Sequence, residues 1–174
     1  MPVDQARSVT MKGQPLALAG KELKVGDRAP DVALVGNDMK EVRLSAWRGK
    51  VCILCSVPSL DTPVCSLETR RFNQEASNLG DGVQILTISM DLPFAQKRWC
   101  GAEGIKRVTT LSDYREAAFG NAYGVLIPDL RLLARAVFVV DQGGVIRYVQ
   151  LVPEIAAEPD YAPALDAAKK LAGK

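Results

Sequence analysis

Two segments of different character meet at the octapeptide Pro58-Ser59-Leu60-Asp61-Thr62-Pro63-Val64-Cys65. The run Val51–Val57 before it is short and apolar, which predicts a buried strand. The run after it is amphipathic and predicts a helix from Thr62 to about Leu79. Thr62 is a favoured N-cap residue, and Pro63 suits the first helical position, where its missing N–H costs no hydrogen bond. The octapeptide therefore predicts a strand–turn–helix unit.

This register predicts Cys65 at the third helical position. Backbone N–H groups without helical partners and the positive end of the helix dipole surround that position, so a negative charge is favoured there. A thiolate carries such a charge, and the thiolate is the reactive form of cysteine. The register alone also fits a small, buried, unreactive cysteine at a helix start.

Length and composition indicate a globular protein. The chain has 174 residues, and we expect residues 1–174 to form one domain with a sizeable core. The formal net charge is +2 without a block of like charge, so neither nucleic acid nor an anionic membrane is suggested as a partner. Apolar stretches are too short to span a bilayer, and Met1–Arg7 shows no apolar signal core. We therefore expect a cytoplasmic protein with mostly reduced cysteines.

The sequence contains four cysteines and no histidine. The lack of histidine excludes a Cys–His pair, a Ser–His–Asp triad and every His-ligated metal site. A reactive cysteine in this chain has to be activated by backbone dipoles and by Arg or Lys side chains. This requirement agrees with a reactive Cys65 at a helix start.

The rest of the chain alternates between strand and helix patterns. Parallel crossovers followed by an antiparallel pair predict an α/β fold, with a mixed central sheet, helices on both faces and an N-terminal β-hairpin at residues 8–18. Asp91 is expected to cap a helix, and Val125–Leu133 is expected to be a loop. Further strands are predicted at Asp31–Val35, Glu41–Leu44, Val83–Ser89, Val108–Leu111, Ala134–Val140 and Val145–Leu151, and helices from Pro93 to Trp99 or Cys100, at Asp113–Tyr123 and from Pro159 to about Leu171.

Cys52 and Cys55 form a C-x-x-C pattern, which in other settings marks a redox-active pair. Both lie inside the predicted strand, where residues three apart point to opposite faces and have Cα atoms about 10 Å apart. A disulfide needs roughly 4.4 to 6.8 Å between Cα atoms, so we predict structural packing for both residues. The same geometry disfavours a zinc site made of the four cysteines, since Cys65 and Cys100 are isolated in the sequence.

The octapeptide resembles the P-x-x-x-T-x-x-C motif of peroxiredoxins, with Pro58, Thr62 and Cys65 at the fixed positions. The longer run Ser56–Ala76 resembles the thiol peroxidase branch of that family, in which S-x-D-T-x-V-C precedes a T-R-[RK]-F-N stretch. Here the second stretch reads Thr69-Arg70-Arg71-Phe72-Asn73. Because the resemblance continues along the whole run, it is more specific than three fixed residues.

Two more segments resemble the same branch. Asp91–Gly104 matches the D-L-P-F-A-Q-x-R-[FW]-C-G-A-E-G signature, in which the cysteine at the position of Cys100 is the resolving cysteine. Ala134–Asp141 matches an A-R-A-V-x-V-x-D stretch, whose arginine corresponds to Arg135. The resemblance implies that this guanidinium lies beside the sulfur of Cys65. From the residues alone, Arg135 also fits a strand-end side chain that extends to solvent.

The resemblance implies a thioredoxin-like fold and the activity of an atypical two-cysteine peroxiredoxin. Cys65 would attack hydrogen peroxide or an organic hydroperoxide and become a sulfenic acid, and Cys100 would form an intrachain disulfide with it. A thioredoxin-type protein would reduce this disulfide, without any metal or organic cofactor. The family is usually a homodimer. The residues implied to bind the peroxide or to shield the sulfur are Pro58, Thr62, Val64, Cys65 and Arg135.

Two other classes of protein stay open from the sequence. A thioredoxin-like disulfide reductase that uses Cys52 and Cys55 would lose activity when either is replaced, and would not need Cys65. A non-enzymatic binding or redox-sensing protein on the same fold would show slow oxidation of Cys65, no faster than that of a free thiol. The three hypotheses differ in which sulfur reacts and how fast.

Overall fold

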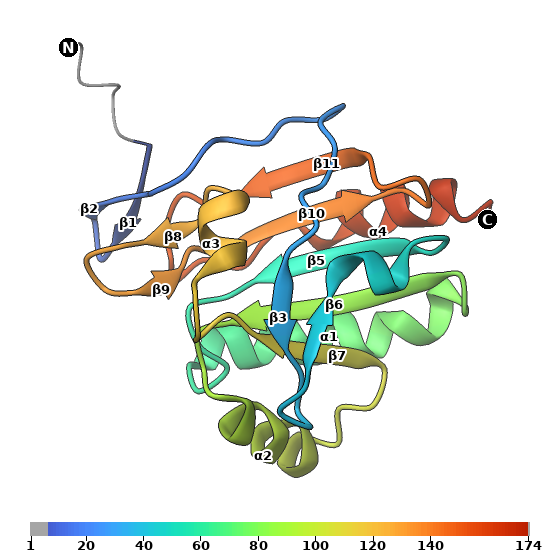
Figure 1. Cartoon of the computed structure of the whole chain (residues 1–174), viewed down its shortest axis with the longest axis horizontal. Helices are drawn as coiled ribbons and strands as arrows, with labels where there is room; N and C mark the ends of the chain where they lie inside the picture. The colour runs from blue at the N-terminus through green and yellow to red at the C-terminus, as the bar shows by residue number, and fades with distance from the viewer. Residues whose placement is uncertain (1–6, 174) are drawn as a thin grey trace.

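The computed structural model describes residues 7–173 and has a seven-stranded sheet at its centre (Figure 1). The strands of this sheet are β3 (Ala33–Val35), β4 (Glu41–Arg43), β5 (Val51–Ser56), β6 (Val83–Ser89), β7 (Val108–Ser112), β10 (Ala136–Val140) and β11 (Ile146–Leu151). They lie in the order β11-β10-β5-β6-β7-β3-β4. β5, β6 and β7 are parallel, whereas each other pairing is antiparallel. The predicted mixed sheet is therefore confirmed.

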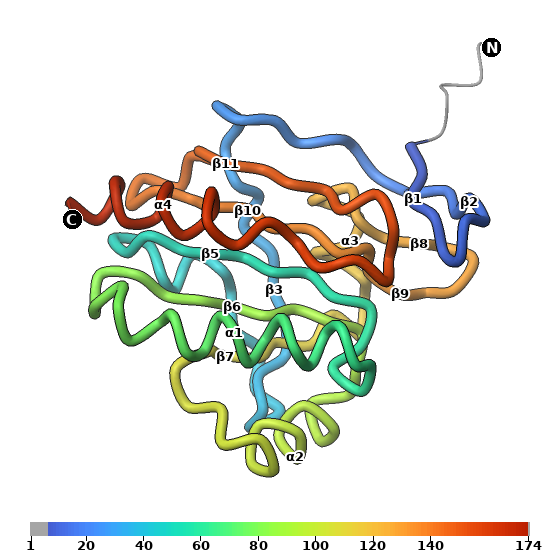
Figure 2. Tube along the Cα trace, turned by 180° about the vertical axis from the view of Figure 1, so that it is seen from behind, coloured from blue at the N-terminus to red at the C-terminus, as the bar shows by residue number. Residues whose placement is uncertain are grey.

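Helices cover both faces of the sheet, as predicted. The helices are α1 (Pro63–Leu79), α2 (Pro93–Glu103), α3 (Ala118–Ala122) and α4 (Tyr161–Leu171), with a 3₁₀ turn at Leu44–Trp47. α1 and α4 lie side by side on one face, in front of the sheet in Figure 2, and α3 lies on the other. α2 packs beside β7. Within residues 7–173, no helix has both the length and the apolar character needed to cross a membrane.

The alternation of side chains along β5 explains the two cores. All six residues of this strand are buried, because both faces of the sheet are covered. Ile53 and Cys55 pack with Phe72 of α1 on one face. Cys52 and Leu54 point to the opposite face, into a second cluster that includes residues of α3 and β10. The run of apolar residues thus serves both layers.

The predicted N-terminal hairpin is present as β1 (Ser8–Met11) and β2 (Gln14–Ala17). Its two-residue turn has positive φ angles of 50° at Lys12 and 79° at Gly13. Such angles match the turn that fits the right-handed twist of a hairpin.

Two sequence expectations in the second half of the chain were wrong. The helix expected at Asp113–Tyr123 is reduced to α3, because Ala117 has a left-handed φ of 52° and the Asp113 carboxylate accepts the N–H groups of Phe119 and Gly120 at 3.0 and 2.8 Å. The expected loop Val125–Leu133 contains a short hairpin, β8 (Leu126–Ile127) and β9 (Leu132–Leu133). Both differences arise from local hydrogen bonds that apolar periodicity does not encode.

The carboxyl ends of the parallel strands β5 and β6 lie at the same edge of the sheet (Figure 1). α1 begins after β5, and α2 begins after β6. The two connecting loops are therefore neighbours at this edge, where crevices of parallel α/β sheets form. α2 runs further than predicted, to Glu103, so Cys100 lies within the helix and not at its end.

Candidate active site

The start of α1 has the predicted register. Thr62 is the N-cap residue, with extended φ and ψ of −122° and 149°, and Pro63 follows at the first helical position. Cys65 is therefore the third helical residue, and the N–H of Ser66 makes the first helical bond to Thr62 O at 3.0 Å. The N–H groups of Val64 and Cys65 belong to the first turn, where helical geometry gives them no partner in the helix.

The Thr62 hydroxyl does not cap the helix. Its Oγ1 donates to the carbonyl oxygen of Ser59 at 2.9 Å and accepts no hydrogen bond from the backbone N–H groups of the first helical turn. The hydroxyl oxygen is consequently free to accept a hydrogen bond from another group. The loop instead closes on itself through this contact between Thr62 and Ser59.

Cys65 is fully buried, with 0% of the residue exposed. It forms a small cluster with Val57 and Leu60, against which Trp99 of α2 packs. Pro58 is also buried and directly follows Val57 at the end of β5. The sulfur is therefore held in an apolar pocket at the helix start, away from bulk water.

The structure places Arg135 beside this sulfur. Arg135 directly precedes β10, and Ala136 pairs with Ser56 at the end of β5, so the antiparallel register brings Arg135 to the start of α1. Ser56 Oγ donates to Ala134 O at 2.7 Å and fixes the approach of the two strands. Nη2 of Arg135 donates to Sγ of Cys65 at 3.1 Å, and Arg135 is only 2% exposed.

The guanidinium of Arg135 is held on three sides. Nη1 donates to Oε2 of Glu68 at 2.9 Å, and Nε and Nη2 donate to the carbonyl oxygen of Ile155 at 3.3 and 2.9 Å. Burial alone would lower the pKa of Arg135, but the charges of Glu68 and Cys65, and the hydrogen bonds to both, raise it above its ordinary value. A permanent cation is therefore fixed at the sulfur.

Glu68 is a part of this arrangement that the sequence reasoning missed. It lies three residues after Cys65 on the same face of α1 and is 0% exposed. Burial raises the pKa of its carboxyl to about 7, although the neighbouring Arg135 acts in the opposite direction. Its Oε1 finds no hydrogen-bond partner within residues 7–173. The sequence did contain a signal for this buried carboxylate, because the glutamate lies one turn after the cysteine predicted to be reactive and on the apolar side of the predicted helix.

We expect the buried Glu68 to make stability depend on pH. Its pKa rises from 4.5 to about 7 on folding, so between these values the unfolded chain has released the proton that the folded chain keeps. The free energy of unfolding should therefore fall as pH rises from about 4.5 to 7, by about 3 kcal/mol from this group. Urea unfolding at several pH values measures the slope.

Glu68→Gln should remove this dependence of the free energy of unfolding on pH, because a glutamine side chain does not titrate. Glu75→Gln is the matched control, since Glu75 lies on the same helix in an ion pair with half-exposed Arg71. An equal pH slope in the wild type and in Glu68→Gln would show that Glu68 does not titrate in this range.

Cys100 lies on α2 and is half-buried against β7. Its Sγ is 3.5 Å from Thr110 Oγ1, which donates to Asn37 Oδ1 at 3.1 Å. Burial raises the pKa of the Cys100 thiol, although hydrogen bonds to Thr110 and Asn37 act against this. The adjacent Trp99 packs against the cluster that contains Cys65. Cys65 and Cys100 are not joined to each other in this arrangement.

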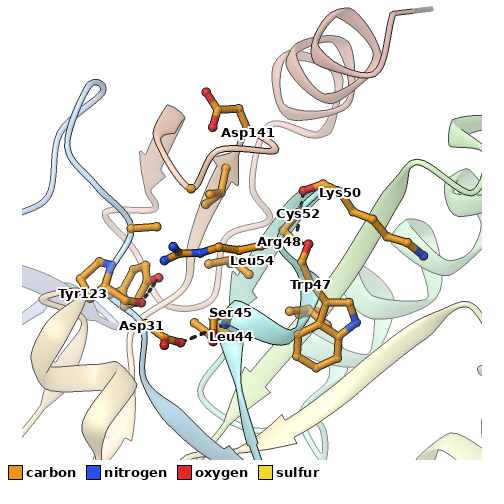
Figure 3. A pocket seen from close by; sticks show the side chains of 15 residues that line it. Asp31, Leu44, Ser45, Trp47, Arg48, Lys50, Cys52, Leu54, Tyr123 and Asp141 are labelled. Carbon is orange, nitrogen blue, oxygen red and sulfur yellow. Dashed lines mark hydrogen bonds between the residues drawn. The ribbon is translucent and has the colours of Figure 1, made fainter.

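Cys52 and Cys55 lie on opposite faces of the sheet, as predicted. Cys52 borders a small cavity of about 30 Å³ beside Trp47 and Tyr123 (Figure 3). Burial raises its pKa to about 11, despite the charge of Lys50. Burial, together with the charge of Glu68, also raises the pKa of Cys55 well above its usual value. Burial therefore disfavours the thiolate, which is the reactive form, at both sulfurs.

Comparison with known proteins identifies relatives over most of the chain. The Redoxin family matches residues 24–165. A thiol peroxidase of Oceanobacillus iheyensis is 60% identical over 154 residues, which are 88% of this chain and 93% of the relative. A thiol peroxidase of Bacillus subtilis is 53% identical over 163 residues, which are 94% of this chain and 97% of the relative.

Solved structures show the same similarity. A peroxiredoxin-like protein from Aquifex aeolicus superposes with a TM-score of 0.89 at 47% identity, over 95% of this chain and 98% of that one. A thiol peroxidase from Chromobacterium violaceum has a TM-score of 0.81 over 94% of each chain, and at 22% identity it supports the thioredoxin-like fold alone. The chain therefore belongs to the thiol peroxidase family of atypical two-cysteine peroxiredoxins and is a thiol-dependent peroxidase.

Proposed function

We propose that the enzyme reduces hydrogen peroxide and organic hydroperoxides with Cys65 as the peroxidatic cysteine and Cys100 as the resolving cysteine. The observation that carries this proposal is the 3.1 Å contact between Arg135 Nη2 and Cys65 Sγ at a buried helix start. A fixed cation and a helix N-terminus both favour the thiolate. Cys52, Cys55 and Cys100 lack a comparable cation in contact with the sulfur within the described chain, and each has a raised pKa.

In the first step, the Cys65 thiolate attacks one oxygen of the hydroperoxide along the O–O axis. The S–O bond forms while the O–O bond breaks, so sulfur loses two electrons and the peroxide gains them. The departing oxygen takes a proton and leaves as water or an alcohol. Cys65 is left as a sulfenic acid.

The site carries donors for the charge that develops on the two oxygens. Arg135 and the N–H groups of Val64 and Cys65 would donate to it, and the free acceptor side of the Thr62 hydroxyl would orient the peroxide hydrogen. Pro58, buried at the end of β5, would keep water from the sulfur. Stabilisation of developing charge by such preorganised groups is the main catalytic contribution in sites of this kind.

In the second step, the Cys100 thiol attacks the sulfenic sulfur of Cys65. A disulfide forms within the chain, and the hydroxyl of the sulfenic acid leaves with the thiol proton as water. Because Cys65 lies in a buried pocket and Cys100 packs against β7, both segments have to rearrange. We expect the first turn of α1 and the end of α2 to unwind on oxidation. Unchanged amide exchange in both segments after oxidation would argue against this rearrangement.

A cleft beside the site offers access for substrate and reductant. It has a volume of about 460 Å³ and lies between the octapeptide loop and α2, with Leu60, Arg98 and Trp99 among its lining residues. Leu60 and Trp99 also belong to the cluster around Cys65. A thioredoxin-type dithiol would reduce the disulfide by exchange and return both thiols. No metal or organic cofactor takes part in these steps.

We also infer a cytoplasmic location and a homodimer. A reducing compartment keeps Cys65 and Cys100 ready as thiols. Leu92 lies just before α2 and is 51% exposed, and Phe94 lies on the first turn of α2 and is 67% exposed. A second copy of the chain would bury this apolar surface. Sedimentation of the reduced protein tests the dimer, and Phe94→Asp should shift it toward monomer.

The proposed function is tested by peroxide-dependent turnover with a thioredoxin-type reductant, together with fluorescence of Trp99. Trp99 packs near Cys65 and adjoins Cys100, so its emission should change once per turnover. The Trp47→Phe variant removes the other tryptophan signal. A change complete at one equivalent of peroxide supports the cycle. Absence of peroxide consumption by the reduced wild type would refute it.

Cys52→Ala and Cys55→Ala should each keep peroxidase turnover within about twofold of the wild type. Burial raises the pKa of both thiols, and the Arg135 guanidinium donates to Cys65, Glu68 and Ile155 instead. Native protein at pH 7 should likewise leave both thiols unmodified by a brief exposure to iodoacetamide. Turnover is measured by consumption of the reductant. Loss of activity in either variant would instead favour the disulfide reductase hypothesis.

A further inference from the structure

We propose that Asp91 is a positioning residue that holds the Cys65 loop closed and ties it to the helix that carries Cys100. This inference rests on the proposed roles of these two cysteines. Asp91 follows β6 and precedes α2, at the sheet edge where β5 also ends. The prediction from the sequence that Asp91 caps α2 was wrong. The N-cap residue is Leu92, whose side chain makes no capping hydrogen bond. The Asp91 carboxylate turns toward the neighbouring loop instead.

Three donors converge on this carboxylate. Oδ1 accepts from Ser59 Oγ at 2.7 Å, and Oδ2 accepts from the N–H of Leu60 at 2.8 Å and from Ser89 Oγ at 2.7 Å. Hydrogen bonds to a charged acceptor are stronger than neutral ones. The contacts with Ser59 and Leu60 cross from one connecting loop to the other, over 31 or 32 residues of chain.

These contacts reach the reactive sulfur through two short routes. Leu60 is 2% exposed and belongs to the cluster that encloses Cys65. The carbonyl oxygen of Ser59 accepts the hydroxyl of Thr62, the N-cap residue of α1. Asp91 therefore fixes both the apolar cover of the sulfur and the position of the hydroxyl proposed to orient the peroxide.

The other side of Asp91 is anchored to the sheet and to α2. Its carbonyl oxygen accepts the hydroxyl of Ser112 at the end of β7. Gln96 of α2 is fully buried, and its Nε2 donates to Ser89 Oγ at 3.0 Å and to the carbonyl oxygen of Leu111 at 2.9 Å. The loop of Cys65 and the first turns of α2 therefore share one polar network.

The network has a direct consequence for the catalytic cycle. The reaction with peroxide needs the closed loop, whereas disulfide formation needs the loop to open. A clamp that stabilises only the closed form should leave the first step intact and slow the second, because opening precedes the approach of Cys100. Weakening the clamp should therefore accelerate disulfide formation without accelerating the reaction with peroxide, which general damage to the fold would not do.

Asp91→Asn is the direct test. The amide has the same shape as the carboxylate but carries no charge, and its NH₂ group replaces an oxygen that accepts a hydrogen bond. We expect disulfide formation from the sulfenic acid to accelerate about tenfold, as the loss of one charge-assisted hydrogen bond implies. The reaction of Cys65 with peroxide should stay the same or become slower. Rapid quenching with a sulfenic-acid trap and a thiol alkylator, followed by peptide mass analysis, separates the two rates.

Two further variants keep the test decisive. Ser59→Ala removes one donor to Asp91 and the acceptor of the exposed Asp61 N–H, but it leaves the charged carboxylate and its Leu60 contact. It should therefore accelerate disulfide formation less than Asp91→Asn does. Asp81→Asn removes a charge from an exposed side chain in the turn between α1 and β6, outside the loop and the cleft, and should change neither step. Unchanged disulfide formation in Asp91→Asn and Ser59→Ala, or equal slowing of both steps, would overturn the proposal.

Amide exchange of the reduced protein separates this inference from the proposed function. The amides of residues 60–66 other than Pro63 should exchange about tenfold faster in Asp91→Asn than in the wild type, whether or not Cys65 reacts with peroxide. If wild-type Cys65 forms no sulfenic acid, the proposed function fails and the exchange rates still decide whether Asp91 holds the loop. Equal exchange in both proteins would show that it does not.

Discussion

Arg135→Met should slow the reaction of Cys65 with peroxide by at least about 100-fold, the effect of losing one preorganised donor to a developing charge. The substitution removes the cation that lies 3.1 Å from the sulfur and replaces it with an unbranched apolar side chain. It also leaves Glu68 buried without its partner, which should lower the free energy of unfolding by about 3–5 kcal/mol. Stopped-flow kinetics and urea unfolding measure the two effects separately.

The loss of stability should be larger at pH 8 than at pH 6. Glu68 has a pKa raised to about 7 by burial, and without Arg135 nothing opposes that shift, so at pH 6 it is neutral and costs little. Arg135→Met/Glu68→Met should recover most of the stability but none of the rate. Recovery of the peroxide reaction in the double variant would contradict a direct role of the guanidinium at the sulfur.

Replacing each proposed cysteine should separate the two halves of the cycle. Cys65→Ser should reduce turnover with a thioredoxin-type reductant by at least about 10³-fold, because it removes the sulfur that receives the Arg135 hydrogen bond and is proposed to attack the peroxide. Cys100→Ser should consume one equivalent of peroxide at a normal rate and then stop as the sulfenic acid. Peroxide consumption per enzyme, with and without reductant, measures both outcomes.

The Cys100→Ser variant should regain turnover when a small dithiol such as dithiothreitol is added, since an external thiol can replace the resolving cysteine. Normal thioredoxin-dependent turnover in this variant would show that Cys100 does not resolve Cys65. Full activity in Cys65→Ser would place the reactive sulfur elsewhere.

The strand–turn–helix unit around Cys65 could be predicted from the sequence because its signals are local. Thr62 and Pro63 define the helix start within two residues, and the third helical position follows by counting. The apolar run of β5 likewise predicted that Cys52 and Cys55 lie on opposite faces. Both results depend only on helix and strand periodicity.

Contacts between distant segments were not accessible in the same way. The place of Arg135 next to Cys65 followed from family resemblance alone, because it depends on the antiparallel register of β10 with β5. Glu68 lies four residues before Phe72 on the buried side of α1, but the sequence does not show which distant residue pairs with its carboxylate, and that residue is Arg135. Asp91 was assigned to the nearest helix, but two of the three donors to its carboxylate, Ser59 and Leu60, lie 32 and 31 residues away in the sequence.

Mapping of cysteine oxidation tests the proposed cycle most directly. One equivalent of cumene hydroperoxide is added to the reduced protein, which is then denatured within seconds in the presence of an alkylating agent so that buried free thiols also react. The cysteines are assigned by peptide mass. We expect a Cys65–Cys100 disulfide within one chain, with Cys52 and Cys55 both alkylated. Alkylation of all four thiols would contradict the proposed chemistry and leave Cys65 as a structural residue at a well-formed helix start.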